Sequence, residues 1–106
     1  MSVYDLMQRV AKEFSNNNIH LKDINPDGYT SGYEPVVGTR FYRIVQTYRH
    51  NGTCTNVTAK IIVYEVKYVR NLSCTFKILE EIKIPKDASD KVIVSRVSKA
   101  IEAYNS

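Results

Sequence analysis

Catalytic or metal chemistry in this chain would depend on its two histidines, two cysteines and scattered carboxylates. His20 lies in a polar segment and His50 at an expected hairpin turn, and a metal site needs more ligands at closer spacing. The sequence also lacks a nucleophile elbow, a phosphate-binding loop and paired carboxylates. We therefore expect no enzyme activity, no metal or other cofactor and no small-molecule substrate, with both imidazoles exposed to solvent.

The two cysteines, Cys54 and Cys74, are predicted to be free thiols. Cys54 begins one expected strand, whereas Cys74 should lie opposite Lys67 near its far end, ~40 Å away at about 3.3 Å per residue. A disulfide needs Cα atoms within roughly 7 Å. Because free thiols are typical of reducing compartments, we expect a cytoplasmic protein.

Three glycosylation sequons, at Asn51, Asn56 and Asn71, instead favour a secreted protein. The first residues lack the basic-then-apolar pattern of a signal peptide, although a mature chain would have lost one. The longest run free of charge and strong polarity, residues 61–64, is far shorter than the ~20 residues that span a bilayer. We expect no membrane segment, and secretion stays the alternative to the cytoplasm.

The length of 106 residues, with 43% hydrophobic and 25% charged residues, predicts a single globular domain over residues 1–106. Its net charge of +4 permits an acidic partner. Basic and acidic residues are mixed along most of the chain, except around residues 40–49 and 60–77.

Helical periodicity predicts one helix near each end of the domain. Residues 3–15 follow Ser2 as an N-cap and should end in the Ser-Asn-Asn-Asn segment at 15–18. Residues 87–104 form the second helix, capped by Asp87 or Ser89.

Strand patterns fill the region between these helices, in residues 39–50, 57–69 and 73–84, with a short extra strand expected at 19–24. Asn51-Gly52 is typical of a type I′ hairpin turn, which would pair Tyr42 with Ile61 and Ile44 with Ala59. A second turn at residues 70–71 would pair Ile78 with Val63 and Ile82 with Ala59. The prediction is an α+β fold, an antiparallel sheet of three to four strands with both helices on one face, in the order α-(β)-β-β-β-α.

One face of this sheet is predicted to carry an apolar core stripe, which in the last strand comprises Cys74, Phe76, Ile78, Ile82 and Ile84. Glu80 interrupts the stripe. It would either reach water at the sheet edge or meet a buried cation such as Arg40.

The opposite face is unusually apolar and aromatic for a solvated sheet, and it also carries basic residues. Its predicted partner-binding residues are Phe41, Arg43, Lys60, Ile62, Tyr64, Val66, Tyr68 and Lys77. Three interpretations remain open. The second helix or the long loop covers the face, a second copy or another protein binds it, or the aromatic rings stack nucleic-acid bases while the basic groups hold phosphates.

The segment before the first long strand, "EPVVGTRFYRI" at residues 34–44, resembles the wedge of the cystatin family of cysteine-protease inhibitors. In that family a Q-x-V-x-G motif precedes aromatic strand residues; here Glu34 replaces the glutamine, and Val36 and Gly38 match. The resemblance spans residues 3–84, and the chain has no Trp for the family's second loop. It implies a loop contact through Glu34, Val36, Val37 and Gly38. Alternatively, Gly38 only relieves a turn before the strand.

These observations together predict a non-catalytic binding protein that contacts a protein partner, or a second copy of itself, through a sheet face or a loop. Cysteine-protease inhibition is the activity that the cystatin resemblance implies. A small basic nucleic-acid-binding accessory protein is the alternative.

Overall fold

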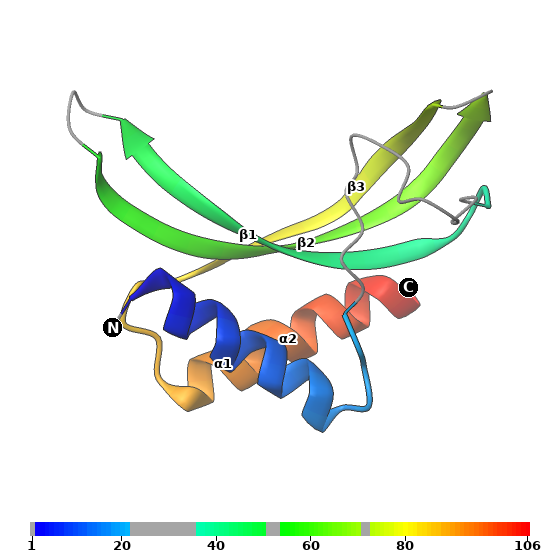
Figure 1. Cartoon of the computed structure of the whole chain (residues 1–106). Coiled ribbons are helices and arrows are strands. Elements are labelled where there is room, and N and C mark those ends of the chain that lie inside the picture. The colour runs from blue at the N-terminus through cyan, green and yellow to red at the C-terminus, as the bar shows by residue number, and fades with distance from the viewer. Residues whose placement is uncertain (1, 22–35, 51–53, 71–72) are drawn as a thin grey trace.

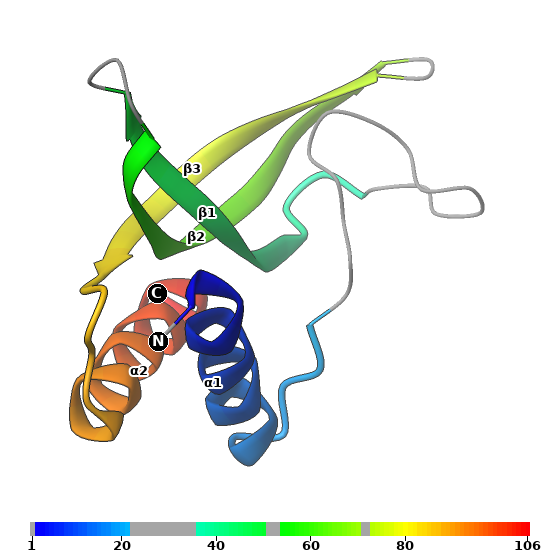
Figure 2. The same ribbon diagram turned by 60° about the vertical axis from the view of Figure 1, so that its left-hand side comes forward.

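The computed structural model describes residues 2–21, 36–50, 54–70 and 73–106. Its elements are α1 (Val3–Asn16), β1 (Arg40–His50), β2 (Cys54–Arg70), β3 (Ser73–Ile84) and α2 (Asp90–Asn105). The strands form one antiparallel sheet in the order β1-β2-β3. Both helices lie side by side against the convex face of the bent sheet (Figures 1 and 2). This confirms the α+β prediction with three strands; residues 19–21 are not a strand, and the rest of the predicted extra strand lies outside the described residues.

Both helices begin after a serine: Ser2 caps α1 as predicted, and Ser89, rather than the alternative Asp87, caps α2, which begins at Asp90 instead of residue 87. The Ser2 hydroxyl accepts a hydrogen bond from the Asp5 N–H at 3.1 Å, and the Ser89 hydroxyl accepts one from the Val92 N–H at 3.3 Å. Each satisfies an N–H group that has no partner inside its helix. Helix α1 ends before Asn18, whose φ of 61° is a left-handed conformation that asparagine tolerates.

The main core lies between the helices and the convex face of the sheet. Its buried residues are Leu6, Val10, Phe14, Tyr42, Ala59, Ile61, Val63, Ile82, Ile84, Ala88, Ile93, Val97 and Ala100. Tyr42 is the aromatic centre, with its ring 4.8 Å from that of Phe14 in α1 and 4.7 Å from that of Tyr104 in α2. Burial, with a smaller contribution from Tyr104, raises the pKa of Tyr42 from its ordinary value of 10.0 to about 12.

The pairing of β1 with β2 differs from the predicted register by two residues. Tyr42 pairs with Val63 and Ile44 with Ile61. Next to the turn His50 pairs with Cys54, one residue away from the predicted register, and an irregularity between Arg49 and His50 adds the second residue of the shift. The predicted Asn51-Gly52 turn lies outside the described residues. Since side chains alternate with a period of two, a two-residue shift leaves each β1 side chain on its predicted face.

The pairing of β2 with β3 contains two irregularities that the sequence analysis missed. Ile82 pairs with Ile61 rather than Ala59, and Ile78 pairs with Tyr64 rather than Val63. Lys67 in β2 and Leu79 in β3 are skipped by the pairing, as at β-bulges.

A one-residue bulge moves the side chains beyond it to the other face, so the predicted stripe of β3 is wrong in its first half. Phe76 packs on the concave face, Ile78 is 50% exposed, and Leu79 packs against the helix-side core instead.

The bulge at Leu79 can be tested by comparing two neighbouring substitutions. Leu79→Ala should lower the free energy of unfolding by about 2 kcal/mol because it removes packing from the main core. Ile78→Ala should cost less than about 1 kcal/mol because half of that side chain is already in water. Urea unfolding of both variants measures the difference. If β3 had no bulge, Ile78 would belong to the core stripe and Leu79 would not, so Ile78→Ala would cause the larger loss of unfolding free energy.

Candidate functional site

Residues 36–39 form a tight turn that presents two valines to solvent. The Thr39 N–H donates to the Val36 carbonyl at 3.0 Å, and Gly38 has a φ of +91°, as at the third position of a type II turn. Val36 is 66% exposed and Val37 58% exposed. The turn therefore places an apolar pair outside the core.

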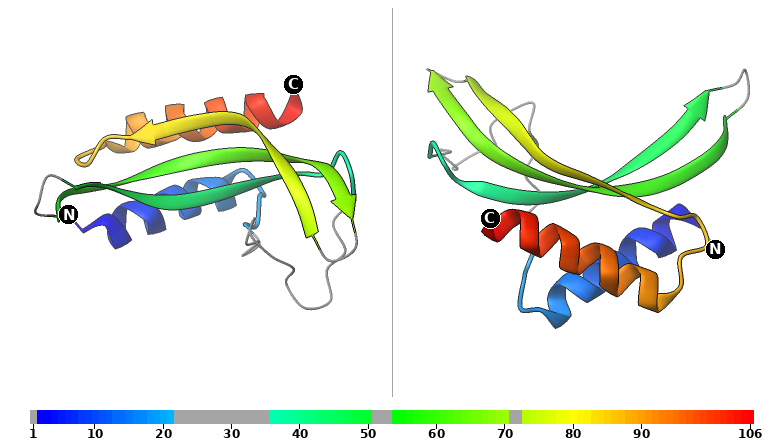
Figure 3. Two further views of the ribbon diagram at one scale, coloured as in Figure 1. Left: turned by 90° about the horizontal axis from the view of Figure 1, so that it is seen from above. Right: turned by 180° about the vertical axis from the view of Figure 1, so that it is seen from behind.

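This turn is also bonded to the neighbouring strand. The Gly38 N–H donates to the Val66 carbonyl, and the Val66 N–H donates to the Thr39 carbonyl, both at 2.8 Å. The ladder between β1 and β2 thus continues into the turn, which lies at the start of β1 beside β2 (Figure 3). Val36, Val37 and Gly38 are held at one end of the sheet, while Glu34 lies outside the described residues.

The concave face carries a second apolar cluster, which we call the concave cluster: Phe41, Ile62, Tyr64 and Val66, with Val45, Val69 and Phe76 packed against it. Its rings contact one another, since Phe41 stacks on Tyr64 at 5.1 Å between centroids and meets Phe76 edge-on at 5.4 Å. None of the first four side chains is more than 8% exposed in the single chain. They share one face, as predicted, but little of their surface remains for a partner to cover.

The bulges separate the other predicted site residues from this cluster. Val69, rather than Tyr68, packs against the concave cluster, and Tyr68 is 54% exposed. Lys77 pairs with Glu65 and lines a cleft beside α2. The eight predicted residues therefore do not form one surface.

The two basic residues that remain on the concave face are only partly available. Lys60 forms an ion pair with Glu81 at 3.1 Å, and Arg43 is half-buried opposite Ile62. The positive charge here is thus weaker than the sequence suggested.

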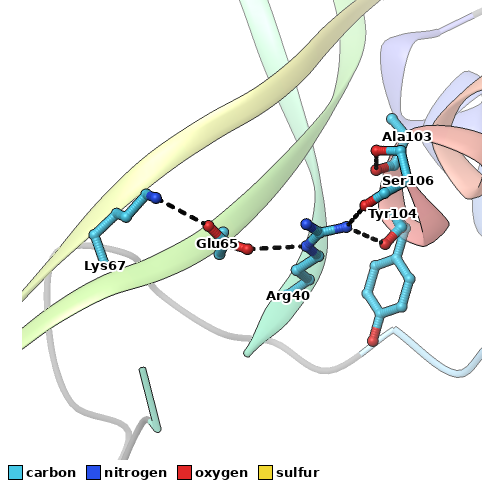
Figure 4. A network of polar contacts seen from close by, with 6 residues as sticks. All are labelled: Arg40, Glu65, Lys67, Ala103, Tyr104 and Ser106. Carbon is cyan, nitrogen blue, oxygen red and sulfur yellow. Dashed lines mark hydrogen bonds and ion pairs between the residues drawn. The ribbon is translucent and has the colours of Figure 1, made fainter. Parts of the chain in front are cut away.

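A polar network behind the turn was not anticipated (Figure 4). Arg40 Nε donates to Glu65 at 3.1 Å, and its guanidinium also donates to the main-chain oxygens of Tyr104, at 2.8 Å, and Ser106. Lys67 contacts the other Glu65 oxygen at 3.3 Å. The network joins the start of β1 to the end of α2. The correct register would have indicated the Arg40–Glu65 pair, because it places these residues opposite each other, but not the contacts with α2.

The same network shifts the titration of Glu65. Hydrogen bonds from Arg40 and then Lys67 hold the pKa of the Glu65 carboxyl below its ordinary value. Glu80, whose partner the sequence left open, meets Lys99 of α2 at 3.7 Å rather than Arg40.

Within the part of the chain that the structure describes, no three His, Cys, Asp or Glu side chains are grouped so that they could hold a metal ion. No helix in that part is long and apolar enough to cross a membrane. Comparisons with protein-family models, curated proteins and solved structures found no match. The geometry of the described residues is therefore what supports a function.

Gly38→Ala should destabilise the protein by about 1–2 kcal/mol because a Cβ is strained at positive φ. The added methyl group itself would meet no atom within 4 Å, so the loss reports backbone strain rather than a clash. Val37→Ala, one residue away, should change stability by less than about 0.5 kcal/mol. Thermal unfolding measures both, and an unchanged midpoint for Gly38→Ala would contradict the turn geometry.

The Glu65 carboxylate should make the free energy of unfolding depend on pH in the acidic range. Its folded pKa is lowered, so its contribution is fully present above the ordinary value of 4.5 and is lost as pH falls through the folded pKa. Glu65→Gln should therefore flatten the pH dependence of unfolding below that value. Glu102→Gln, a substitution at an exposed position on α2, is the control and should follow the wild type.

Proposed function

We propose that this chain is a non-catalytic protein-binding protein that inserts the Val36-Val37 turn into an apolar cleft of its partner. The observation that carries the proposal is that both valines are exposed on a turn whose main chain is bonded within itself and to β2. Isolated exposed valines are common, but two adjacent ones on a hydrogen-bonded turn form a preorganised apolar tip.

Burial of this tip would supply a useful binding energy. Fully burying one valine side chain is worth ~1.5–3 kcal/mol, so two of them supply several kcal/mol before association costs are subtracted. Because the turn is held by three main-chain hydrogen bonds, less conformational entropy is lost on binding than for a free loop.

The cystatin resemblance supports the same use of the segment, since its wedge motif coincides with this turn. Val36 and Gly38 match the motif, and Gly38 has the positive φ that a glycine there permits. A cysteine protease is thus the partner class that we propose first.

Nucleic-acid binding through the concave face has less support. The Phe41 and Tyr64 rings stack on each other instead of presenting free faces, and Lys60 is engaged by Glu81. A dimer through the concave cluster has less support for a related reason, because the cluster is already buried in one chain.

A titration of papain activity with the chain tests the proposed contact. The wild type should inhibit papain, and the double variant Val36→Ser, Val37→Ser should lose inhibition without loss of stability because both side chains are exposed. Tyr4→Ser is the matched control, since Tyr4 is 64% exposed but lies on α1; it should inhibit as the wild type does.

Two further outcomes would replace the proposal. If neither papain nor any protein captured from a cell extract distinguishes the wild type from the double serine variant, the turn is not the binding element. If the chain instead binds single-stranded oligonucleotides with log affinity falling linearly with log salt, the nucleic-acid alternative is correct.

A further inference from the structure

An open cleft of about 420 Å³ lies between β3 and the C-terminal end of α2, and none of its lining residues belongs to the Val36-Val37 turn or the concave cluster. Its residues come from two short segments: Lys77, Ile78, Leu79 and Glu80 of β3, and Lys99, Glu102, Ala103 and Ser106 at the end of α2. The helical residues follow the spacing i, i+3, i+4, i+7, which is one face of a helix. Figure 3 shows α2 running along this side of the sheet.

The strand contribution has a different geometry, because four consecutive residues of β3 line the cleft. Leu79 and Glu80 lie toward the helix side, whereas Ile78, opposite Tyr64, lies toward the other side, so a cleft that all three line reaches around the outer edge of β3. In the described sheet β3 pairs with β2 alone, so its outer edge has no strand beside it there. Outward main-chain N–H and C=O groups of such an edge can pair with another strand.

The charges around the cleft leave one group of each sign without a partner among the described residues. Glu80 pairs with Lys99 across the cleft at 3.7 Å. Glu65, the register partner of Lys77, is already bonded to Arg40 and Lys67. Lys77 and Glu102 therefore remain available to a bound molecule, one from the strand wall and one from the helix wall.

We infer that this cleft binds an extended peptide segment of a partner protein, which adds to β3 as a fourth strand and lies against α2. An edge strand beside a helix face recognises a peptide through main-chain hydrogen bonds, and side chains from both walls then select its sequence. Complementarity predicts an acidic peptide side chain next to Lys77 and a basic one next to Glu102. Small apolar side chains would contact the exposed half of Ile78 and Ala103.

The probe for this inference is a displayed library of random heptapeptides, selected on the folded chain. The wild type should enrich sequences that carry an acidic and a basic residue at a fixed separation. Lys77→Glu, a change at an exposed side chain, should exchange the preferred acidic residue for a basic one, and circular dichroism checks that the variant keeps its fold with Glu65 opposite the new carboxylate. Glu102→Lys should reverse the other preference.

The most enriched heptapeptide is synthesised in two forms, with N-methyl groups on the odd or on the even residues, to separate strand addition from side-chain contact alone. One of the two forms should bind about tenfold more weakly or worse, since it loses the N–H donors that face β3. The inference is overturned if no sequence is enriched, if Lys77→Glu keeps the acidic preference, or if N-methylation has no effect. The double variant Val36→Ser, Val37→Ser should bind the peptide normally, so failure here is distinguishable from failure of the turn.

Discussion

Strand β2 is the only strand in the described sheet that is paired on both sides, and it is buried on both faces. Ile61 and Val63 face the helices, whereas Ile62 and Val66 belong to the concave cluster. Both helices lie on the convex side. On the concave side, Phe41 stacks on Tyr64 and meets Phe76 edge-on, so these rings contact one another across three neighbouring strands.

The two bulges in the pairing of β2 with β3 decide which side chains these two strands present. At Leu79 the pairing skips one residue, which directs Leu79 to the main core and leaves Ile78 partly in water. At Lys67 a second skipped residue turns Tyr68 outward. Among the exposed apolar side chains, Val36 and Val37 lie on a turn and Ile78 on the edge strand, and both proposed contacts use these rather than the middle of a sheet face.

Hydrogen bonds of Arg40 connect the Val36–Thr39 turn, strand β2 and the end of α2. Arg40 follows the Val36–Thr39 turn directly, pairs with Glu65 of β2 and donates to main-chain oxygens at the end of α2. That end of α2 supplies one wall of the proposed peptide cleft. One guanidinium thus holds the base of the exposed turn and the C-terminal end of the helix against the same strand, which gives both surfaces a defined position.

By itself, the sequence determined the element order, the Ser2 cap of α1 and the faces on which the side chains of β1, and of β2 before Lys67, lie. These features depend on local contacts, such as Ser2 with Asp5, and on a period-two pattern that a two-residue register shift leaves unchanged. Only the tertiary structure decided the register, the bulges at Lys67 and Leu79, the burial of the concave cluster in one chain and the Arg40–Glu65 pairing. A bulge has little local signal because it is set by how two strands fit together. Burial likewise depends on which distant side chains arrive, so neither could be predicted from spacing along one strand.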